Sequence, residues 1–291
     1  MLPIGNGIFL LQKLRKEGMC MTKPNLGWNE KKLKRFLNEG RGQGEGEHYV
    51  PWTKVHEFSS KGRVTRIFGI KTNRIHHLHS DNQLRAFLIF EWCDRVVDIR
   101  ECFPLLDIME VVDDKANLRF DKFCDKDTGE QLVITTNFLL TVKESDGSKR
   151  YVARTVKNTT ELNKKITFEK LEIERRYWHS RGVDWKVITE KELDRQYCKN
   201  LEWIREVLLE NDEKYNGVEK ETTSNMLHQI IMNNQDSTLR KVLKDFEEDE
   251  GLDSGEGLYL FRYLVAKKRL RIDLKNKINL SRKVKEIIKD N

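Results

Sequence analysis

The chain has 291 residues, of which 38% are hydrophobic and 35% are charged, and it contains only four prolines. This balance is typical of a soluble, helix-rich globular protein and excludes a mainly disordered chain. The formal net charge of +7 favours a polyanionic partner such as nucleic acid. No apolar run approaches the roughly 20 residues that a membrane span requires, so no membrane contact is expected. The five cysteines form no CxxC pair, which indicates free thiols in a reducing cytoplasm.

Taken in chain order, the first predicted element is a helix over residues 29–37, which ends at Gly40. Residues 40–46 then carry a glycine at every second position. This spacing resembles a phosphate cradle, but no GK[ST] follows it and no strand precedes it. A flexible connection is therefore the preferred interpretation.

A second helix is predicted to begin after Ser80. Residues 63–70 alternate like a strand, and residues 71–74 indicate a turn. Ser80 can cap the following helix, and Gln83 three residues later completes a capping box. Apolar residues then recur at helical spacing: Leu84, Phe87, Leu88 and Trp92. Short strands or buried segments are predicted over 96–99 and 103–106.

The clearest β unit follows further along the chain. Residues 132–142 are rich in β-branched and aromatic side chains, and a turn at 145–148 leads to a second strand over 150–156. A helix over 168–180 and a strand over 185–189 come next. This order of elements predicts a mixed α/β core.

From residue 190 onwards the pattern becomes helical. A long helix is expected to reach Leu208, with a polar linker over 211–221 after it. The later helices are predicted over 224–232, 238–246 and 257–265. Alternating apolar residues over 270–280 then predict a two-stranded hairpin, and helices followed by such a hairpin are typical of a winged helix.

The C-terminal region is strongly basic. From Arg262 to Lys285 there are ten basic residues and one acidic residue, a net charge of +9. Such a segment suits contact with DNA phosphates. A solvated basic face and a protein-docking surface are the alternative interpretations.

Several blocks between residues 39 and 203 resemble the TnsA endonuclease subunits of heteromeric bacterial transposases. In order, they are EGRGQG at 39–44 with YVPW at 49–52, RIHHL at 74–78 with SD at 80–81, DIRE at 98–101 with FPLL at 103–106, FEKL at 168–171 with ERRYW at 174–178, and NLEW at 200–203. The blocks cover more than half of the chain in a compatible spacing.

The resemblance implies an α/β, restriction-endonuclease-like domain over 29–189. It also implies a C-terminal helical, winged-helix-like domain over 190–291 that contacts partner proteins, and residues 1–28 form an N-terminal extension expected to be disordered. In this family the subunit cuts the 5′ ends of the transposon. The implied partners are transposon-end DNA, a DDE-type transposase (TnsB-like) and an AAA+ regulator (TnsC-like).

The resemblance also implies a catalytic site. In the family, Mg²⁺ is held by a helix Glu, a hairpin Asp and a strand Gln that stands two residues before a Lys. These positions fall on Gln83, Asn137, Thr155 and Lys157. Only Lys157 keeps the expected residue type. Each amide removes one negative charge from the metal shell, and Mg²⁺ depends on such charged oxygens.

Other residues could in principle replace one of these ligands. The acidic ones are Glu91, Asp94, Asp98, Glu101, Asp121, Asp125 and Asp127, and the histidines are His76, His77 and His79. Surface charge is the usual role of such carboxylates, and Asp98 and Glu101 beside Arg100 indicate a structural ion pair. The histidines favour packing or DNA contact over zinc binding.

Three functions remain open from the sequence. The chain is an active Mg²⁺-dependent endonuclease with an unconventional ligand set, a catalytically depleted subunit that binds DNA and bridges partners, or a winged-helix DNA-binding regulator.

Overall fold

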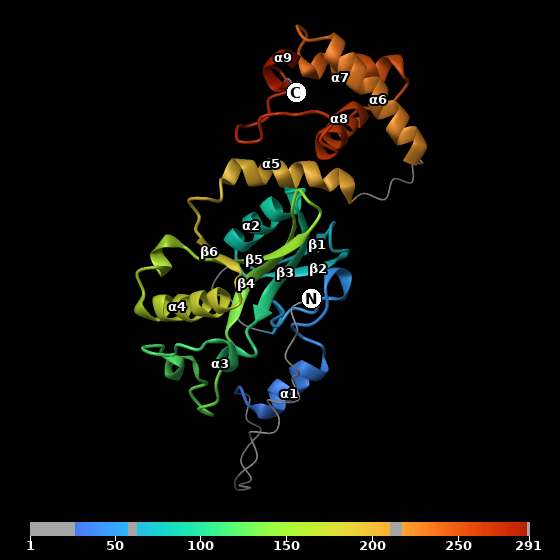
Figure 1. Ribbon diagram of the computed structural model, residues 1–291. Helices are drawn as coiled ribbons and strands as arrows, with labels where there is room; N and C mark the ends of the chain where they lie inside the picture. Colours follow the sequence, from blue (N-terminus) through green and yellow to red (C-terminus); the bar gives the residue numbers. More distant parts are fainter. Residues whose placement is uncertain (1–26, 58–62, 210–216, 290–291) are drawn as a thin grey trace. The chain divides into compact units, whose positions relative to one another are not determined.

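The computed structural model describes residues 27–57, 63–209 and 217–289. The chain divides into two compact units, Met1–Glu192 and Leu193–Asn291 (Figure 1). Most of the expected N-terminal extension and residues 211–216 of the expected linker lie outside the described residues. Within the described residues, no helix has both the length and the apolar character needed to cross a membrane.

A four-stranded sheet is the centre of the first unit. Its strands lie in the order β3-β4-β5-β6, and a separate antiparallel pair is formed by β1 and β2. Only β5 and β6 run parallel, and the crossover between them contains α4. The strands are β1 (Thr65–Gly69), β2 (Arg74–Leu78), β3 (Val96–Pro104), β4 (Thr135–Lys143), β5 (Lys149–Val156) and β6 (Asp184–Ile188).

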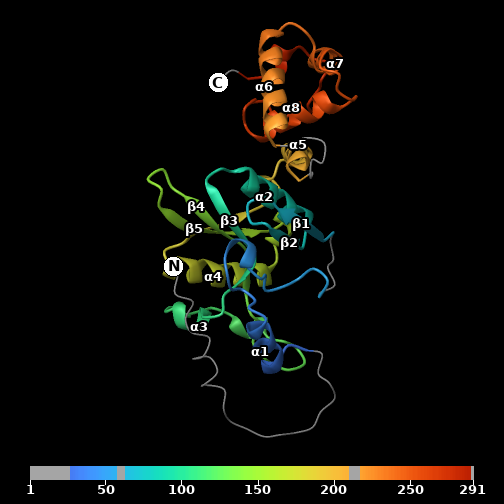
Figure 2. The same ribbon diagram turned by 90° about the vertical axis from the view of Figure 1, so that its right-hand side faces the viewer.

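Helices cover the two faces of this sheet (Figures 1 and 2). From α2 (Asp81–Trp92), Phe90 packs on Phe138 of β4 with ring centroids 5.3 Å apart. The next residue of β4, Leu139, lies in the other core together with Trp178 of α4 (Lys165–Ser180). Because neighbouring strand residues point to opposite faces, α2 and α4 lie on opposite sides of the sheet.

Smaller elements complete the first unit. They are α1 (Glu30–Asn38), α3 (Ile108–Val111) and the 3₁₀ helices η1 (Gly46–His48), η2 (Phe120–Phe123) and η3 (Thr159–Glu161). Trp28 and Trp52 pack against Phe36 of α1, and the three side chains form an aromatic cluster. Trp28, which the sequence interpretation placed in the extension, is thus packed against this unit.

The α/β prediction for this region is confirmed, with local differences. The two short segments expected at 96–99 and 103–106 are one continuous strand, β3. The block at 74–78 forms β2, which the sequence interpretation had not assigned as a strand. A tight turn makes this pairing possible, because Asn73 adopts the left-handed backbone region with φ of 52°.

The start of α2 was predicted correctly, but only half of its capping box forms. Ser80 Oγ accepts a hydrogen bond from Gln83 N at 3.2 Å. Gln83 Oε1, however, accepts from His79 N at 2.8 Å and not from the N-cap residue. The amide side chain of Gln83 therefore holds the turn that precedes the helix.

Removal of this cap should be measurable. We expect Ser80→Ala to lower the free energy of unfolding by about 1 kcal/mol, because one backbone donor at the start of α2 loses its partner. Urea denaturation followed by circular dichroism measures the change. Ser281→Ala is the control, since the exposed Ser281 side chain caps nothing. Equal losses in the two variants would contradict the assignment.

The second unit is helical. Its elements are α5 (Arg195–Arg205), η4 (Glu206–Leu208), α6 (Gly217–Asn233), α7 (Leu239–Asp249), α8 (Glu256–Ala266) and α9 (Val284–Ile287). The predicted helices are present (Figure 2). Helix α6 begins at Gly217, so the last part of the predicted linker is helical instead.

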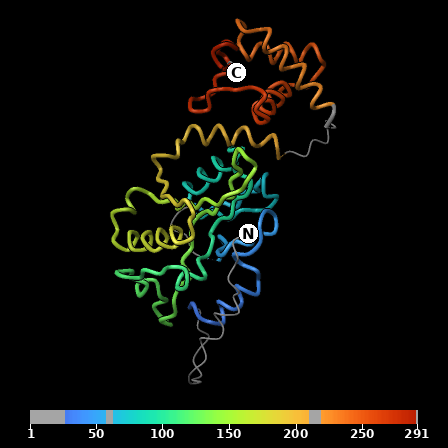
Figure 3. Tube along the Cα trace, in the orientation of Figure 1, coloured from blue at the N-terminus to red at the C-terminus, as the bar shows by residue number. Residues whose placement is uncertain are grey.

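The predicted C-terminal hairpin is wrong. Residues 270–280 contain no strand and follow an irregular path in the Cα trace (Figure 3). Ile272 instead forms an isolated bridge with Ile288. The carbonyl groups of Leu274 and Asn276 accept hydrogen bonds from Asn200 Nδ2 of α5, at 2.7 and 2.8 Å. A side chain thus takes the place of a partner strand, and the winged-helix prediction is not confirmed.

Candidate functional site

The four positions implied by the sequence lie around the ends of β4 and β5. The ladder between these strands stops at the pair Phe138 and Arg154, so Asn137 and Thr155 lie just past it. Asn137 Oδ1 accepts a hydrogen bond from Val156 N at 2.7 Å. The side chain of Asn137 therefore continues the strand pairing where the backbone carbonyls no longer do.

Thr155 belongs to a buried network between the sheet and α4. Its Oγ1 donates to Glu174 Oε2 at 2.5 Å and accepts from Trp185 Nε1 at 3.1 Å. Thr136 has the matching arrangement on β4, since it donates to the same oxygen at 3.0 Å and accepts from Trp178 Nε1 at 2.8 Å. The Glu174 carboxylate thus joins β4 and β5 where their ladder ends.

Glu174 is the member of this site that the sequence interpretation did not single out as functional. Its side chain is fully buried, and Oε1 has no hydrogen-bond partner among the described residues. Lys170 Nζ lies 3.4 Å from this oxygen. The signal was present in the block at 174–178, where a Glu stands on the helix face that also carries Tyr177 and Trp178.

Lys157 follows β5 directly, and its backbone N donates to Ile188 O at 3.0 Å. Its side chain is partly buried, and Nζ has no hydrogen bond or ion pair with any residue that the structure describes. Burial, together with the nearby Lys170, lowers the pKa of Lys157 below its ordinary value of 10.5. Glu161 and Glu174 act on this ammonium group in the opposite direction, but neither forms an ion pair with it.

The first turn of α2 lies beside the end of β5. Asn82 Nδ2 donates to Asn158 Oδ1 at 2.6 Å, which ties the residue before Gln83 to the residue after Lys157. Gln83 is buried, with 8% of its surface exposed. The fold therefore places Gln83, Asn137, Thr155 and Lys157 in one region of the first unit.

The residues present do not fit a magnesium ion. A magnesium site needs several oxygen ligands, at least some of them charged. The carbonyl oxygens of Gln83 and Asn137 already accept backbone N–H groups, and the Thr155 hydroxyl is buried between Trp185 and Glu174. In the described ranges no group of three His, Cys, Asp or Glu side chains is placed to hold a metal ion.

The acidic residues weighed as substitute ligands have other roles. Glu91 accepts from Ile70 N at 2.7 Å, and Asp98 Oδ2 lies 3.4 Å from Arg100 Nε, the predicted ion pair. Asp121 pairs with Arg119, and Asp125 accepts backbone N–H groups from Trp28, Asp127 and Thr128. Asp94 and Asp127 are exposed.

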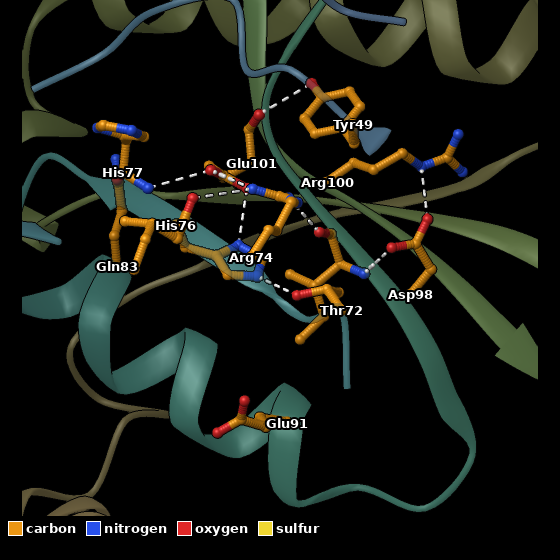
Figure 4. Close-up of polar contacts among 12 residues, drawn as sticks. Tyr49, Thr72, Arg74, His76, His77, Gln83, Glu91, Asp98, Arg100 and Glu101 are labelled. Atoms are coloured by element: carbon orange, nitrogen blue, oxygen red, sulfur yellow. Dashed lines mark hydrogen bonds and ion pairs between the residues drawn. The ribbon is translucent and has the colours of Figure 1, made fainter. Parts of the chain in front are cut away.

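Glu101 is the centre of a buried polar cluster beside α2 (Figure 4). Both of its oxygens pair with the Arg74 guanidinium, at 2.9 and 2.6 Å, and His76 Nδ1 lies 2.8 Å from Oε2. His77 N donates to Oε1 at 3.0 Å. Burial alone would raise the pKa of Glu101, but His76 and Arg74 outweigh burial and hold it well below the ordinary value.

The three histidines do not converge on one point. His76 is fully buried and its Nε2 lies 2.7 Å from Thr72 Oγ1, so this residue has the packing role that was expected. His77 Nδ1 accepts from Val55 N at 3.3 Å, and His79 Nε2 lies 3.2 Å from Thr53 Oγ1. Burial lowers the pKa of both His77 and His79.

Comparison with known proteins finds a matching family for a part of each unit. The family described as TnsA-like endonuclease N terminal matches residues 93–190, and the family described as TnsA endonuclease C terminal matches residues 192–274. The transposon Tn7 transposition protein TnsA of Escherichia coli is 36% identical over 250 residues, which is 84% of this chain and 87% of that protein. The chain therefore belongs to the TnsA family of transposition endonuclease subunits.

Proposed function

We propose that this TnsA-family subunit takes part in transposition by binding transposon-end DNA and partner proteins, and that it does not itself cut DNA. The proposed partners are a DDE-type transposase and an AAA+ regulator, the latter through the unit that begins at Leu193. The family role, Mg²⁺-dependent cleavage at the 5′ ends of the transposon, would then require another nuclease, or the element would move by a replicative route.

One observation carries this proposal: the two amide oxygens at the implied carboxylate positions already accept hydrogen bonds from the backbone. Gln83 Oε1 and Asn137 Oδ1 accept from the backbone N atoms of His79 and Val156. Within an amide side chain only the oxygen can accept a hydrogen bond from a backbone N–H, so the amide nitrogens of Gln83 and Asn137 remain unbonded. A dication meeting these groups would face N–H dipoles instead of oxygen lone pairs.

The charges of the second unit support partner contact less strongly than the sequence indicated. Arg262, Arg269 and Lys285 of the basic segment pair with Glu206, Glu221 and Asp236. The exposed side chains of Arg271, Lys275 and Lys277 form no ion pair with a described residue. These three cations are the part of the segment that we expect to meet an acidic protein surface or a DNA phosphate.

The test is a nicking assay on transposon-end DNA with the partner transposase and either Mg²⁺ or Mn²⁺. We expect the unaltered chain to support assembly on the DNA and to leave the 5′ ends uncut, because none of the three implied ligand positions carries a carboxylate. Cleavage by the unaltered chain that disappears in Lys157→Ala would overturn the proposal. A partner subunit lacking its own catalytic carboxylates removes background cutting of the other strand.

A further inference from the structure

The hydrogen bonds at the former ligand positions fix what the site presents. The oxygens of Gln83 and Asn137 are directed at backbone N–H groups, at 2.8 and 2.7 Å. Their amide nitrogens have no hydrogen-bond partner among the described residues, and neither is among the fully buried unpartnered atoms there. Each amide therefore offers two N–H donors that solvent or a ligand can reach.

Lys157 adjoins the residues that hold this part of the site together. Lys157 lies one residue beyond Val156, whose N–H holds the Asn137 side chain, and one residue before Asn158, which the first turn of α2 contacts. Its ammonium forms no ion pair with a described residue. In a partly buried place, a lysine that forms no ion pair gains from binding an anion directly.

The charges that act on Lys157 have both signs: Lys170 opposes its protonation, and Glu161 and Glu174 favour it. Lys170 Nζ lies near Lys157 and is shared with Glu174 Oε1 at 3.4 Å and Thr135 O at 3.1 Å. Glu174 itself is fully buried beneath Thr155 and Thr136, so its carboxylate does not reach the open side of the site. N–H donors and an unpaired ammonium together match the oxygens of a phosphate group.

We infer that this site holds a DNA backbone phosphate directly, without a metal ion, through the amide N–H groups of Gln83 and Asn137 and the ammonium of Lys157. The inference rests on the proposed function, because it takes the metal to be absent. It adds that the amides of Gln83 and Asn137 replace phosphate binding through a metal ion with direct phosphate binding. A site with two carboxylates repels a phosphate unless a dication lies between them, whereas this site attracts the phosphate itself.

The test compares DNA affinity with and without a divalent cation. The probe is a fluorescein-labelled DNA duplex of random sequence, titrated with the full chain in EDTA and again in Ca²⁺, which binds such sites without promoting cleavage. In EDTA, we expect Gln83→Glu with Asn137→Asp to weaken binding about tenfold or more, because two negative charges replace N–H donors. Ca²⁺ should restore that affinity and leave the unaltered chain unchanged.

The matched control makes the same two kinds of substitution, Asn to Asp and Gln to Glu, at other positions. It is Asn38→Asp with Gln43→Glu, on exposed side chains without hydrogen bonds. Equal losses in this control and in the site variant would overturn the inference, as would tighter DNA binding by the unaltered chain in Ca²⁺. Nicking by the unaltered chain would instead overturn the proposed function, so the two failures are distinguishable.

A substitution of Lys157 provides an independent test of the inference. In Lys157→Gln, which keeps a donor but removes the charge, the slope of log Kd against log salt should fall by about 1, as for the loss of one phosphate contact. Circular dichroism confirms that the variant is folded. An unchanged slope would show that Lys157 meets no phosphate and would overturn its part in the site.

Discussion

The Gln83→Glu, Asn137→Asp double variant should bind Mn²⁺ at least about 100-fold more tightly than the unaltered chain. The reason lies in the geometry of the two side chains. In each, one oxygen can keep its bond to the backbone N of His79 or Val156, while the amide nitrogen becomes a second, charged oxygen. The variant therefore gains two negative charges without a change of shape. Isothermal titration calorimetry with Mn²⁺ measures the affinity.

Thr155 is left unaltered in this experiment because its hydroxyl is buried between Glu174 and Trp185, where a longer side chain would not fit. Asn38→Asp with Gln43→Glu adds the same two charges on exposed side chains and serves as a control for non-specific binding. Nicking of transposon-end DNA by the double variant, and its loss on Lys157→Ala, would show that the scaffold remains competent. Equal Mn²⁺ affinity in the double variant and the unaltered chain would contradict the role assigned to the amides.

Glu101→Gln should lower the free energy of unfolding by about 3–5 kcal/mol, which is the usual result of removing one partner of a buried ion pair. Glu101 is 0% exposed and receives hydrogen bonds from Arg74 and from His77 N, with His76 Nδ1 also in contact. The amide would leave the Arg74 guanidinium, itself buried, without a counter-charge. Thermal and urea unfolding of the full chain measure the loss.

The pH dependence tests the same carboxylate. The pKa of Glu101 in the fold lies below its ordinary value of 4.5, so its contribution to stability is complete at neutral pH. That contribution is lost as the pH falls below 4.5, and the difference between the unaltered chain and Glu101→Gln should narrow there. Glu110→Gln, at an exposed site without an ion pair, is the control. A loss under 1 kcal/mol at neutral pH would contradict the prediction.

Much of the first unit could be predicted from local pattern. Ser80 marks the start of α2 because a short hydroxyl side chain is what an N-cap requires. The strands around residues 132–156 follow from β-branched residues and a polar turn, since these are local preferences. The hairpin predicted over 270–280 failed for a non-local reason. Asn200, 74 residues from Leu274, supplies the hydrogen bonds that a second strand would have made.

The sequence by itself determined the family and the core elements, and its resemblance to that family pointed to Gln83, Asn137, Thr155 and Lys157. It also determined that amides stand at Gln83 and Asn137, where the resemblance implies carboxylates, because charge depends on residue type alone. Only the tertiary structure decided which end of each amide faces the site. That orientation depends on backbone N–H groups elsewhere in the fold, and it leaves N–H donors, not oxygens, where the family would hold its metal.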